Sequence, residues 1–358
     1  MIDYLVVGQG IAGTLMAYFL QKAGQQVHVL DNDYPRSASK HSAGILNPIT
    51  GRRYVKSWRI EELLPFAHTT YREMEAEFGI NVLHPMPMIR TLYDQRDRNN
   101  WMLRITDPTY AVYMDGKADL GTYEGRLHPD FSYGQTLQTA RLDIPALLTH
   151  FRNYWQERGE LTIKQLDINE LQLHAEGVTY GDLQARQVIF CEGNWAKQNP
   201  FFNYLPFRGS KGEVLEVKIP EVNFDRILKR RLFIVPLQNG NYWIGTTNHN
   251  WYDHDLPTSE GRAEIIEKLK VFLRPDFEII SHHSAIKPTV KDRRPFLGNH
   301  PEYTQLGIFN GLGTKGASLG PFWASHYVAH LTGGAKLDSA VDIERFPLAS
   351  TEEGVKNH

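Results

Sequence analysis

Cysteine is almost absent from this chain of 358 residues, which contains only Cys191. One thiol cannot form an intramolecular disulfide, so the fold does not depend on an oxidising compartment. Long apolar runs are missing too, because no stretch of about 18 apolar residues occurs that could cross a membrane. The chain begins directly with a strand-like run and a glycine motif, without a basic segment or a cleavage-like site. We therefore expect no signal peptide, no integral membrane segment and a cytoplasmic location.

The sequence also lacks an excess of charge of either sign. Lys and Arg number 39, Asp and Glu 41, and the formal net charge is −2. This balance gives no electrostatic reason to expect nucleic acid or an anionic membrane as the main partner, although a local basic patch is compatible with it. Residues 249–255 and 282–283 hold His and Asp at short spacing, but no matching Cys/His cluster occurs elsewhere. We therefore expect no metal site.

The N-terminal segment has the order of a dinucleotide-binding unit. Residues 2–7 predict a buried parallel strand, and Gly8-Gln9-Gly10-Ile11-Ala12-Gly13 follows at once, before a helical pattern and a second strand at 27–30. The three glycines permit a tight turn, a close approach of a pyrophosphate and close helix–strand packing. Asp31 follows Gly13 by 18 residues, near the spacing of an acid that binds ribose hydroxyls. The predicted cofactor residues here are Gly8, Gly10, Ile11, Ala12, Gly13, Asp31 and Asn32.

Two further segments favour FAD over NAD. Residues 36–48 form a loop of small residues that could lie along an extended cofactor, where a nicotinamide dehydrogenase would continue with another βα unit. Residues 306–309 predict a strand, which Gly311, Gly313, Gly316 and a helical pattern follow. This is a second strand–glycine loop–helix unit, whose amides could face another part of the cofactor.

Five segments in order resemble the D-amino-acid-oxidase-like FAD-dependent oxidoreductases, the family of glycine oxidase and sarcosine oxidase. These are residues 42–46 (Ser-Ala-Gly-Ile-Leu), 188–195, 206–214, 286–298 and 310–321. The resemblance implies FAD bound by further residues, namely Ser42, Ala43, Gly44, Ile45, Cys191, Gly193, Trp195, Gly313, Thr314, Lys315 and Gly316. Some relatives attach flavin through a cysteine near the C-terminus, and none occurs at that place here. We therefore expect non-covalent FAD.

The resemblance implies an α/β fold in which a Rossmann-type FAD-binding domain is interleaved with an antiparallel-sheet substrate domain. The FAD-binding domain would comprise residues 1–80, 138–208 and 285–350, and the substrate domain residues 81–137 and 209–284. Within the latter, short strand-like runs alternate with turn signals, and a helix is expected at 259–272 with Ser259 as its N-cap.

Two lysines are the candidate catalytic residues. Lys315, in the second glycine loop, could place positive charge where the reduced flavin becomes anionic, and the alternative is a solvated loop lysine. Lys287 stands where amino-acid oxidases of the family have Arg before Pro, and Phe233 stands where they have Tyr. Lys holds an anion as a point charge and not in the planar fork of Arg. An acidic substrate and an amine without a carboxylate therefore both stay open.

Other polar and aromatic residues have two interpretations each. Arg52 and Arg53, with Trp58, could line a substrate entrance, but a solvated turn is favoured. Trp101, Tyr110 and Tyr113 could shape a pocket or pack in the core.

The leading hypothesis is an FAD-dependent oxidoreductase that oxidises a C–N bond of an amine or amino acid by hydride transfer to flavin. The substrate would be a small molecule, which is anionic in one of the two possibilities left open above. The electrons would pass to oxygen or to another carrier. The alternatives are a 2-hydroxy-acid dehydrogenase of the same fold, a non-catalytic flavin-binding protein and, last, a plain NAD dehydrogenase.

Overall fold

The computed structural model describes residues 1–220 and 222–348. An eight-stranded, largely parallel sheet has the order β11-β2-β1-β14-β13-β12, with β21 on β14 and β20 on β21. The strands predicted at residues 2–7, 27–30 and 306–309 are confirmed, and the last two each continue for one more residue. The strands of this sheet are β1 (Ile2–Val7), β2 (Val27–Asp31), β11 (Leu161–Ile163), β12 (Gln172–His174), β13 (Gly177–Tyr180), β14 (Leu183–Phe190), β20 (Phe296–Asn299) and β21 (Leu306–Asn310).

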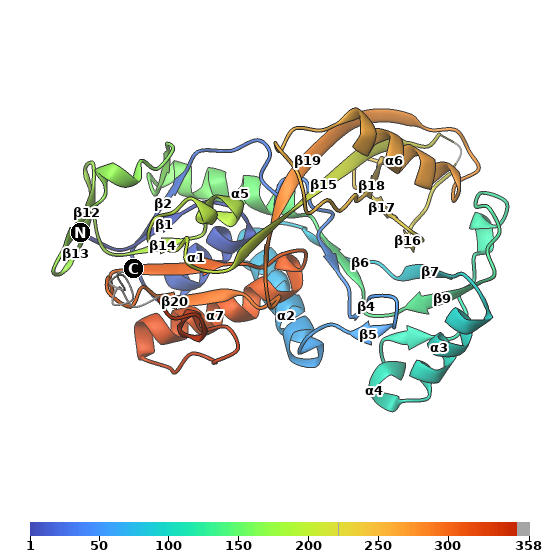
Figure 1. Cartoon of the computed structure of the whole chain (residues 1–358), viewed down its shortest axis with the longest axis horizontal. Helices are drawn as coiled ribbons and strands as arrows, with labels where there is room; N and C mark the ends of the chain where they lie inside the picture. Colours follow the sequence, from blue (N-terminus) through green and yellow to red (C-terminus); the bar gives the residue numbers. More distant parts are fainter. Residues whose placement is uncertain (221, 349–358) are drawn as a thin grey trace, which may run out of the picture.

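Four long helices accompany this sheet: α1 (Ile11–Lys22), α2 (Ile60–Phe78), α5 (Ile144–Glu157) and α7 (Gly316–Gly333). Helix α1 packs against both α5 and α7, and α2 packs against α7 (Figure 1). Leu15, Met16 and Trp323 are fully buried in the shared core. Because α1 and α7 are apolar on almost every side, each is held between the sheet and other helices.

The second large sheet is mostly antiparallel, in the order β19-β15-β18-β17-β16-β7-β9-β8. Its strands are β7 (Met88–Leu92), β8 (Met114–Asp115), β9 (Ser132–Thr136), β15 (Phe207–Lys218), β16 (Ile227–Lys229), β17 (Phe233–Pro236), β18 (Tyr242–Gly245) and β19 (Glu278–Val290). Helix α6 (Ser259–Lys270) covers one face, where its Ile265 and Leu269 meet Ile234 and Ile244. The other face is left for the cavity described below.

The N-cap of α6 differs from the sequence prediction. Thr258, and not Ser259, has the extended backbone of a capping residue, and its hydroxyl accepts a hydrogen bond from the Gly261 amide at 3.0 Å. Ser259 is already the first helical residue. The prediction was one residue late because both neighbours have side chains that can cap.

The remaining elements are short. They are the strands β3 (Ile45–Leu46), β4 (Ile49–Thr50), β5 (Val55–Lys56), β6 (Leu83–Pro85) and β10 (Ala140–Leu142), the helices α3 (Gln95–Ile105) and α4 (Pro108–Ala111), and four 3₁₀ turns at Gly121–Tyr123, Ile168–Glu170, Gly193–Lys197 and Ile343–Arg345. No helix in the described part of the chain has the length and apolar character needed to cross a membrane.

The two large sheets are connected by their longest strands. β15 and β19 pair along their whole lengths, from Phe207 opposite Val290 to Lys218 opposite Glu278. In Figure 1 both strands run from beside the parallel sheet into the second sheet. They therefore extend across the boundaries proposed at residues 208 and 284, and the division into an FAD-binding and a substrate domain stays a prediction.

Candidate active site

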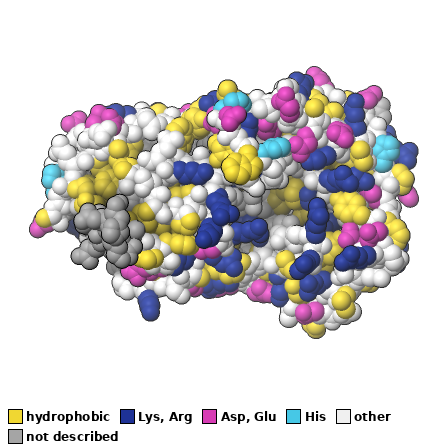
Figure 2. All heavy atoms as spheres, viewed as in Figure 1, with side chains coloured by type: hydrophobic (Ala, Val, Ile, Leu, Met, Phe, Trp, Pro, Cys, Tyr) yellow, Lys and Arg dark blue, Asp and Glu magenta, His cyan; other side chains and the backbone are white. Residues whose placement is uncertain are grey.

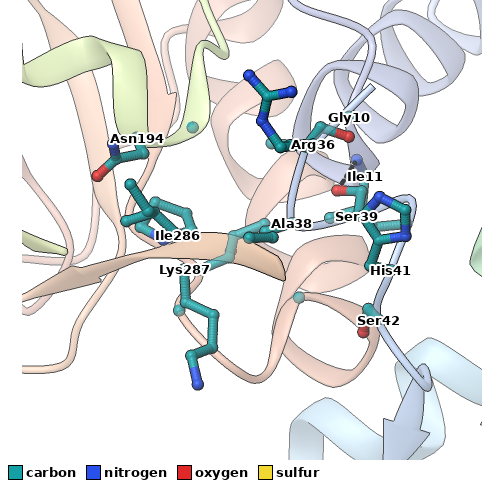
Figure 3. Close-up of a pocket in the computed structure, with 18 of the residues that line it drawn as sticks. Gly10, Ile11, Arg36, Ala38, Ser39, His41, Ser42, Asn194, Ile286 and Lys287 are labelled. Atoms are coloured by element: carbon teal, nitrogen blue, oxygen red, sulfur yellow. Dashed lines mark hydrogen bonds between the residues drawn. The ribbon is translucent and has the colours of Figure 1, made fainter. Parts of the chain in front are cut away.

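A cavity of about 860 Å³ lies where the strand ends of the parallel sheet meet the open face of the second sheet. Every residue predicted from the sequence to bind cofactor lines it, except Gly13. Lys287 and Lys315 line it as well. Figure 3 shows Gly10, Ile11, Ser39 and Ser42 on one side, and Ile286 and Lys287 on the strand that faces them. The segments that the sequence pattern selected, although far apart in the chain, thus line one continuous cavity.

The first glycine motif makes a close turn between β1 and α1. Gly8 has φ +98°, and a Cβ atom there would lie 2.6 Å from the Cys191 carbonyl oxygen. A Cβ atom at Gly13 would lie 1.7 Å from the Gly8 carbonyl oxygen. Gly13 therefore brings helix and turn together instead of lining the cavity. The N-cap residue of α1, Gly10, has no capping side chain, and the first turn has no acidic residue. Ser39 accepts from the Ile11 amide only, so the rest of this helix end can receive an anion.

Asp31, at the end of β2, already accepts hydrogen bonds inside the protein. Its Oδ1 accepts from the Gln9 amide at 2.7 Å, and its Oδ2 accepts from the Asp33 amide at 2.8 Å and from Arg152. An ionised carboxylate has about four lone-pair sites, so capacity for a ribose hydroxyl remains. The sequence did not predict the contact of Arg152, on α5, with Asp31. The pattern of a helix does not show which strand end one of its side chains will reach.

The loop of small residues after β2 lies along the cavity, as expected. Ser39 Oγ accepts a hydrogen bond from the Ile11 amide at 3.0 Å, which fixes this loop against the start of α1. Gly44 has φ +67°, and a Cβ atom there would lie 1.9 Å from the Leu142 carbonyl oxygen. Glycine is therefore required where the loop passes β10.

The second glycine loop brings a second helix N-terminus to the cavity. Gly316 is the first residue of α7, and a Cβ atom there would lie 2.9 Å from Ile11 Cγ2. No side chain caps α7, and its first turn lacks acidic residues. The uncapped starts of α1 and α7 thus lie together, each with a partial positive charge.

Cys191, Gly193 and Trp195 follow β14 on the same cavity wall. The Cys191 thiol is buried, and burial holds its pKa well above the usual value. The neighbouring Glu192 accepts a hydrogen bond from Asn199 Nδ2 at 2.8 Å, and burial raises the pKa of Glu192 to about 7. A thiol that stays protonated serves as a small packing group here.

Lys287 and Lys315 both line the cavity, Lys287 from β19 and Lys315 from the second glycine loop. The loop is fixed to β19, since the Gly313 amide donates to the Pro288 carbonyl at 3.2 Å. Lys287 Nζ donates to Asn248 Oδ1 at 2.6 Å, and Lys315 Nζ donates to Ser57 Oγ at 2.9 Å. Burial lowers the pKa of each lysine to about 8.

Neither lysine has a carboxylate partner in the described part of the chain. Each is held instead by a neutral side chain, which orients the ammonium group without neutralising it. The interpretation of Lys315 as a solvated loop residue is therefore wrong. Two desolvated positive charges in one cavity suit an anion or a developing negative charge.

The other candidates lie outside the cavity. Arg52 and Arg53 are exposed on a turn, as the favoured interpretation expected. Trp101 is fully buried and packs on Tyr54, so it belongs to the core. Trp58 stacks on Trp323, with ring centroids 5.4 Å apart. Tyr110 and Tyr113 are also absent from the cavity wall. Within the described ranges, no group of three or more His, Cys, Asp or Glu side chains is placed to hold a metal ion.

Several residues of the cavity wall were not predicted as site residues. Asp255 Oδ2 accepts a hydrogen bond from the Tyr34 hydroxyl and forms an ion pair with Arg36, whose Nε lies 3.0 Å away. These contacts connect the loop before α6 to the loop after β2. The pattern of small residues in the sequence predicted that the loop after β2 lies along the cavity, but no such pattern marks the loop before α6. The unpredicted wall residues include Tyr34, Arg36, Ser39, His41, Asn47, Thr50, Glu192, Trp243, Asn248, Tyr252 and Asp255.

Comparison with known proteins agrees with this geometry. The family model described as "FAD dependent oxidoreductase" (DAO) matches residues 3–331. The chain belongs to this family. By family it is an FAD-dependent oxidoreductase, and its mixed α/β fold is that of the family.

Three similar proteins illustrate the relationship. The bifunctional protein ThiO/ThiG of Trichormus variabilis is 25% identical over 351 residues, which cover 90% of this chain and 51% of that protein. The chain thus spans about half the length of the bifunctional relatives that it matches. Glycine oxidase of Bacillus licheniformis is 23% identical, with 89% of this chain and 90% of that protein covered. The crystal structure of iminodiacetate oxidase from Chelativorans sp. BNC1 has a TM-score of 0.79 at 21% identity, with 96% and 98% covered.

The residues present fit FAD. A Cβ atom at Gly10 would lie 3.1 Å from Ser39 Oγ, so the glycine lets the loop after β2 lie close to the start of α1, and both residues line the cavity. The same cavity continues to the uncapped start of α7 and to Lys315. One wall can therefore receive a diphosphate and the other a ring system that becomes anionic on reduction.

Proposed function

We propose that this FAD-dependent oxidoreductase oxidises a C–N bond in an amine or amino acid that carries an anionic group. The observation that carries the proposal is the pair Lys287 and Lys315 in the cavity that fits FAD, both desolvated and without a carboxylate partner among the described residues. A buried cation without a counter-ion is costly, and a bound anion would compensate it. The electrons would then pass to oxygen or to another carrier, and the single thiol suits a reducing, cytoplasmic compartment.

When bound, FAD supplies the acceptor for the substrate hydrogen. The tasks of this chain are to bind, orient and desolvate. Lys287 Nζ, oriented by Asn248, would hold the substrate anion, and Lys315 Nζ, oriented by Ser57, would stabilise negative charge on the reduced ring. The apolar side chains of Phe233 and Trp243 line the same cavity and exclude water from the reacting bond.

The binding residues that we assign to FAD are those of the two glycine loops and the segments around Ser42 and Cys191. We infer non-covalent binding, because the one thiol is buried and lies at the end of β14. The role of each residue is part of the proposal. Its support is that the cavity joins all these segments in one wall.

The test is an absorption spectrum of the purified protein, followed anaerobically as compounds are added in turn. Glycine, sarcosine, iminodiacetate and other amines form one panel, and 2-hydroxy acids form the second. We expect flavin bands that bleach with one or more anionic amines. Bleaching by 2-hydroxy acids alone would replace the proposal with C–O oxidation. Flavin that no compound of either panel bleaches would contradict turnover of small anionic amines.

A further inference from the structure

Lys229 lies at the end of β16, away from the two lysines already described. Its Nζ is 4.0 Å from the centroid of the Phe233 ring, and Phe233 lines the cavity. Lys229 is directly opposite Phe233 on β17, so both side chains project from the same face of the sheet. Lys229 therefore stands beside the cavity, with one aromatic ring between its ammonium group and the interior.

Arg90 is the neighbour of Lys229 on the other side. It lies opposite Lys229 in the parallel register of β7 and β16, which places a second cation on the same face. Arg90 Nη2 donates to the Gly51 carbonyl at 2.8 Å, and its guanidinium lies 4.7 Å from the centroid of the Tyr54 ring. Gly51 follows Thr50, which lines the cavity. Arg90 thus connects the sheet to the cavity rim.

These two cations have few compensating charges. Within residues 1–220 and 222–348, no carboxylate forms an ion pair with Lys229 or Arg90. Asp97 is the carboxylate that acts on Arg90, at longer range. Burial, assisted by Arg90 and Lys268, lowers the pKa of Lys229 to about 7. Two like charges held together at a partly buried place destabilise the fold unless an anion joins them.

The open face of the second sheet therefore has two positive regions. Lys287 lies on β19, and Lys229 lies on β16, four strand spacings away in the order β19-β15-β18-β17-β16. At roughly 4.8 Å per spacing, the two strands are about 20 Å apart. Phe233 and Trp243 line the cavity between them. Figure 2 shows Lys and Arg side chains gathered around a hollow in the face of the molecule that is turned toward the viewer.

We propose that Lys229 and Arg90 bind a second anionic group of the substrate, a carboxylate or a phosphate on its far end. The inference rests on the proposed function for the position of the reacting end, at Lys287 and Lys315. It narrows the substrate class to an extended amine or amino acid with anionic groups at both ends. A molecule as small as glycine would leave the region of Lys229 and Arg90 unused.

The test measures binding to the flavin-loaded protein, and not turnover. The probes are linear dicarboxylates from succinate to sebacate and the matching monocarboxylates from butyrate to decanoate, followed by the change in flavin absorption. A phosphonocarboxylate series of the same lengths is compared with the dicarboxylates. Tighter binding of one series shows whether the second anionic group is a phosphate or a carboxylate. We expect the longer dianionic probes to bind roughly tenfold more tightly than monocarboxylates of the same length.

Lys229→Met should abolish this advantage while the monocarboxylates change less than twofold, and Lys229→Arg should retain it. The matched control is Lys270→Met, because Lys270 is exposed on α6, which covers the opposite face of the same sheet. Equal affinity of both series in the unmodified protein would overturn the inference. So would a Lys229→Met variant, folded by circular dichroism, that keeps the dianion advantage.

This experiment separates the two proposals. A dianion advantage that depends on Lys229, in a protein whose flavin no amine bleaches, would retain the second anion site and refute amine oxidation. Flavin bleaching by short anionic amines without any dianion advantage would do the reverse.

Discussion

Gly316 packs directly on Ile11, so that the first residue of α7 touches the first residue of α1. A Cβ atom at Gly316 would lie only 2.9 Å from Ile11 Cγ2. This contact fixes the distance between two uncapped helix N-termini and hence the shape of the cofactor cavity. A close approach of this kind requires a residue without a side chain.

Gly316→Ala should therefore weaken FAD binding by roughly fivefold or more, although Ala favours a helix by up to about 1 kcal/mol. The measurement is the FAD dissociation constant, by fluorescence titration of the deflavinated protein. Combining it with Ile11→Ala should cost less than the sum of the single changes, because the clash is removed. The control is Gly333→Ala, where a Cβ atom meets nothing within 4 Å. Additive losses in the double variant would contradict the packing argument.

Lys287 gives a prediction about pH. Burial lowers its pKa to about 8, as it does for Lys315, so both are charged below pH 8 and lose their protons above it. The affinity for anionic ligands should therefore fall as the pH rises from 7 to 9. The measurement is the dissociation constant of acetate from the flavin spectrum at each pH. Constant affinity over this range would exclude both lysines as the anion site.

Substitution of Lys287 separates the roles of the two lysines. Lys287→Met should raise KM for an anionic amine by roughly 10- to 100-fold, which corresponds to loss of one charge-assisted hydrogen bond. The flavin content should stay the same, because the Met side chain fills similar space. Lys287→Arg should recover part of the loss. An unchanged KM in Lys287→Met would place the substrate anion elsewhere.

Lys229 should reduce the stability of the protein. Its pKa in the folded protein is about 7, below the value of 10.5 expected when unfolded. The cost of holding the charge is thus fully present below pH 7, declines as the pH rises above 7, and vanishes above 10.5. Lys229→Met should gain roughly 1–3 kcal/mol at pH 7. Urea unfolding at pH 7 and 10 measures this gain, with Lys270→Met as control, and a loss at pH 7 would contradict it.

Asp255 joins two loops across the cavity rim through Arg36 and Tyr34. The ion pair is partly exposed and screened by salt, so its contribution to the stability of the fold is small. Asp255→Asn should speed FAD dissociation several-fold, and high salt should reproduce part of the effect in the unmodified protein. Asp253→Asn is the control, since Asp253 is an exposed neighbour in the same loop. Identical dissociation rates for the two variants would show that the connection does not retain FAD.

The sequence predicted the parts of the site that depend on local order. The strand, glycine turn and helix at residues 2–22 follow one another directly, and their periodicities are visible without a partner segment. The same holds for the loop before α7, and both units line one cavity. Gly13 has the packing role that the motif assigns to its third glycine, although it was also counted among the cofactor residues and does not line the cavity.

What the sequence could not predict depends on pairing between distant segments. Asp255 meets Arg36 across more than two hundred residues, and no local pattern connects them. Lys229 and Arg90 become neighbours only through the register of β16 on β7. Register is decided by the packing of whole strands, so a sequence pattern identifies the strands but not which residues face each other.

The long pairing of β15 with β19 also determines how the molecule can be divided. A cut at residue 208 or 284 would divide one ladder of hydrogen bonds and leave two strand edges with unpaired, aggregation-prone backbone groups. Neither of the two predicted domains could therefore be produced alone as a stably folded, soluble fragment. Heating should unfold both large sheets in one calorimetric peak, and bound flavin should be released in that same transition.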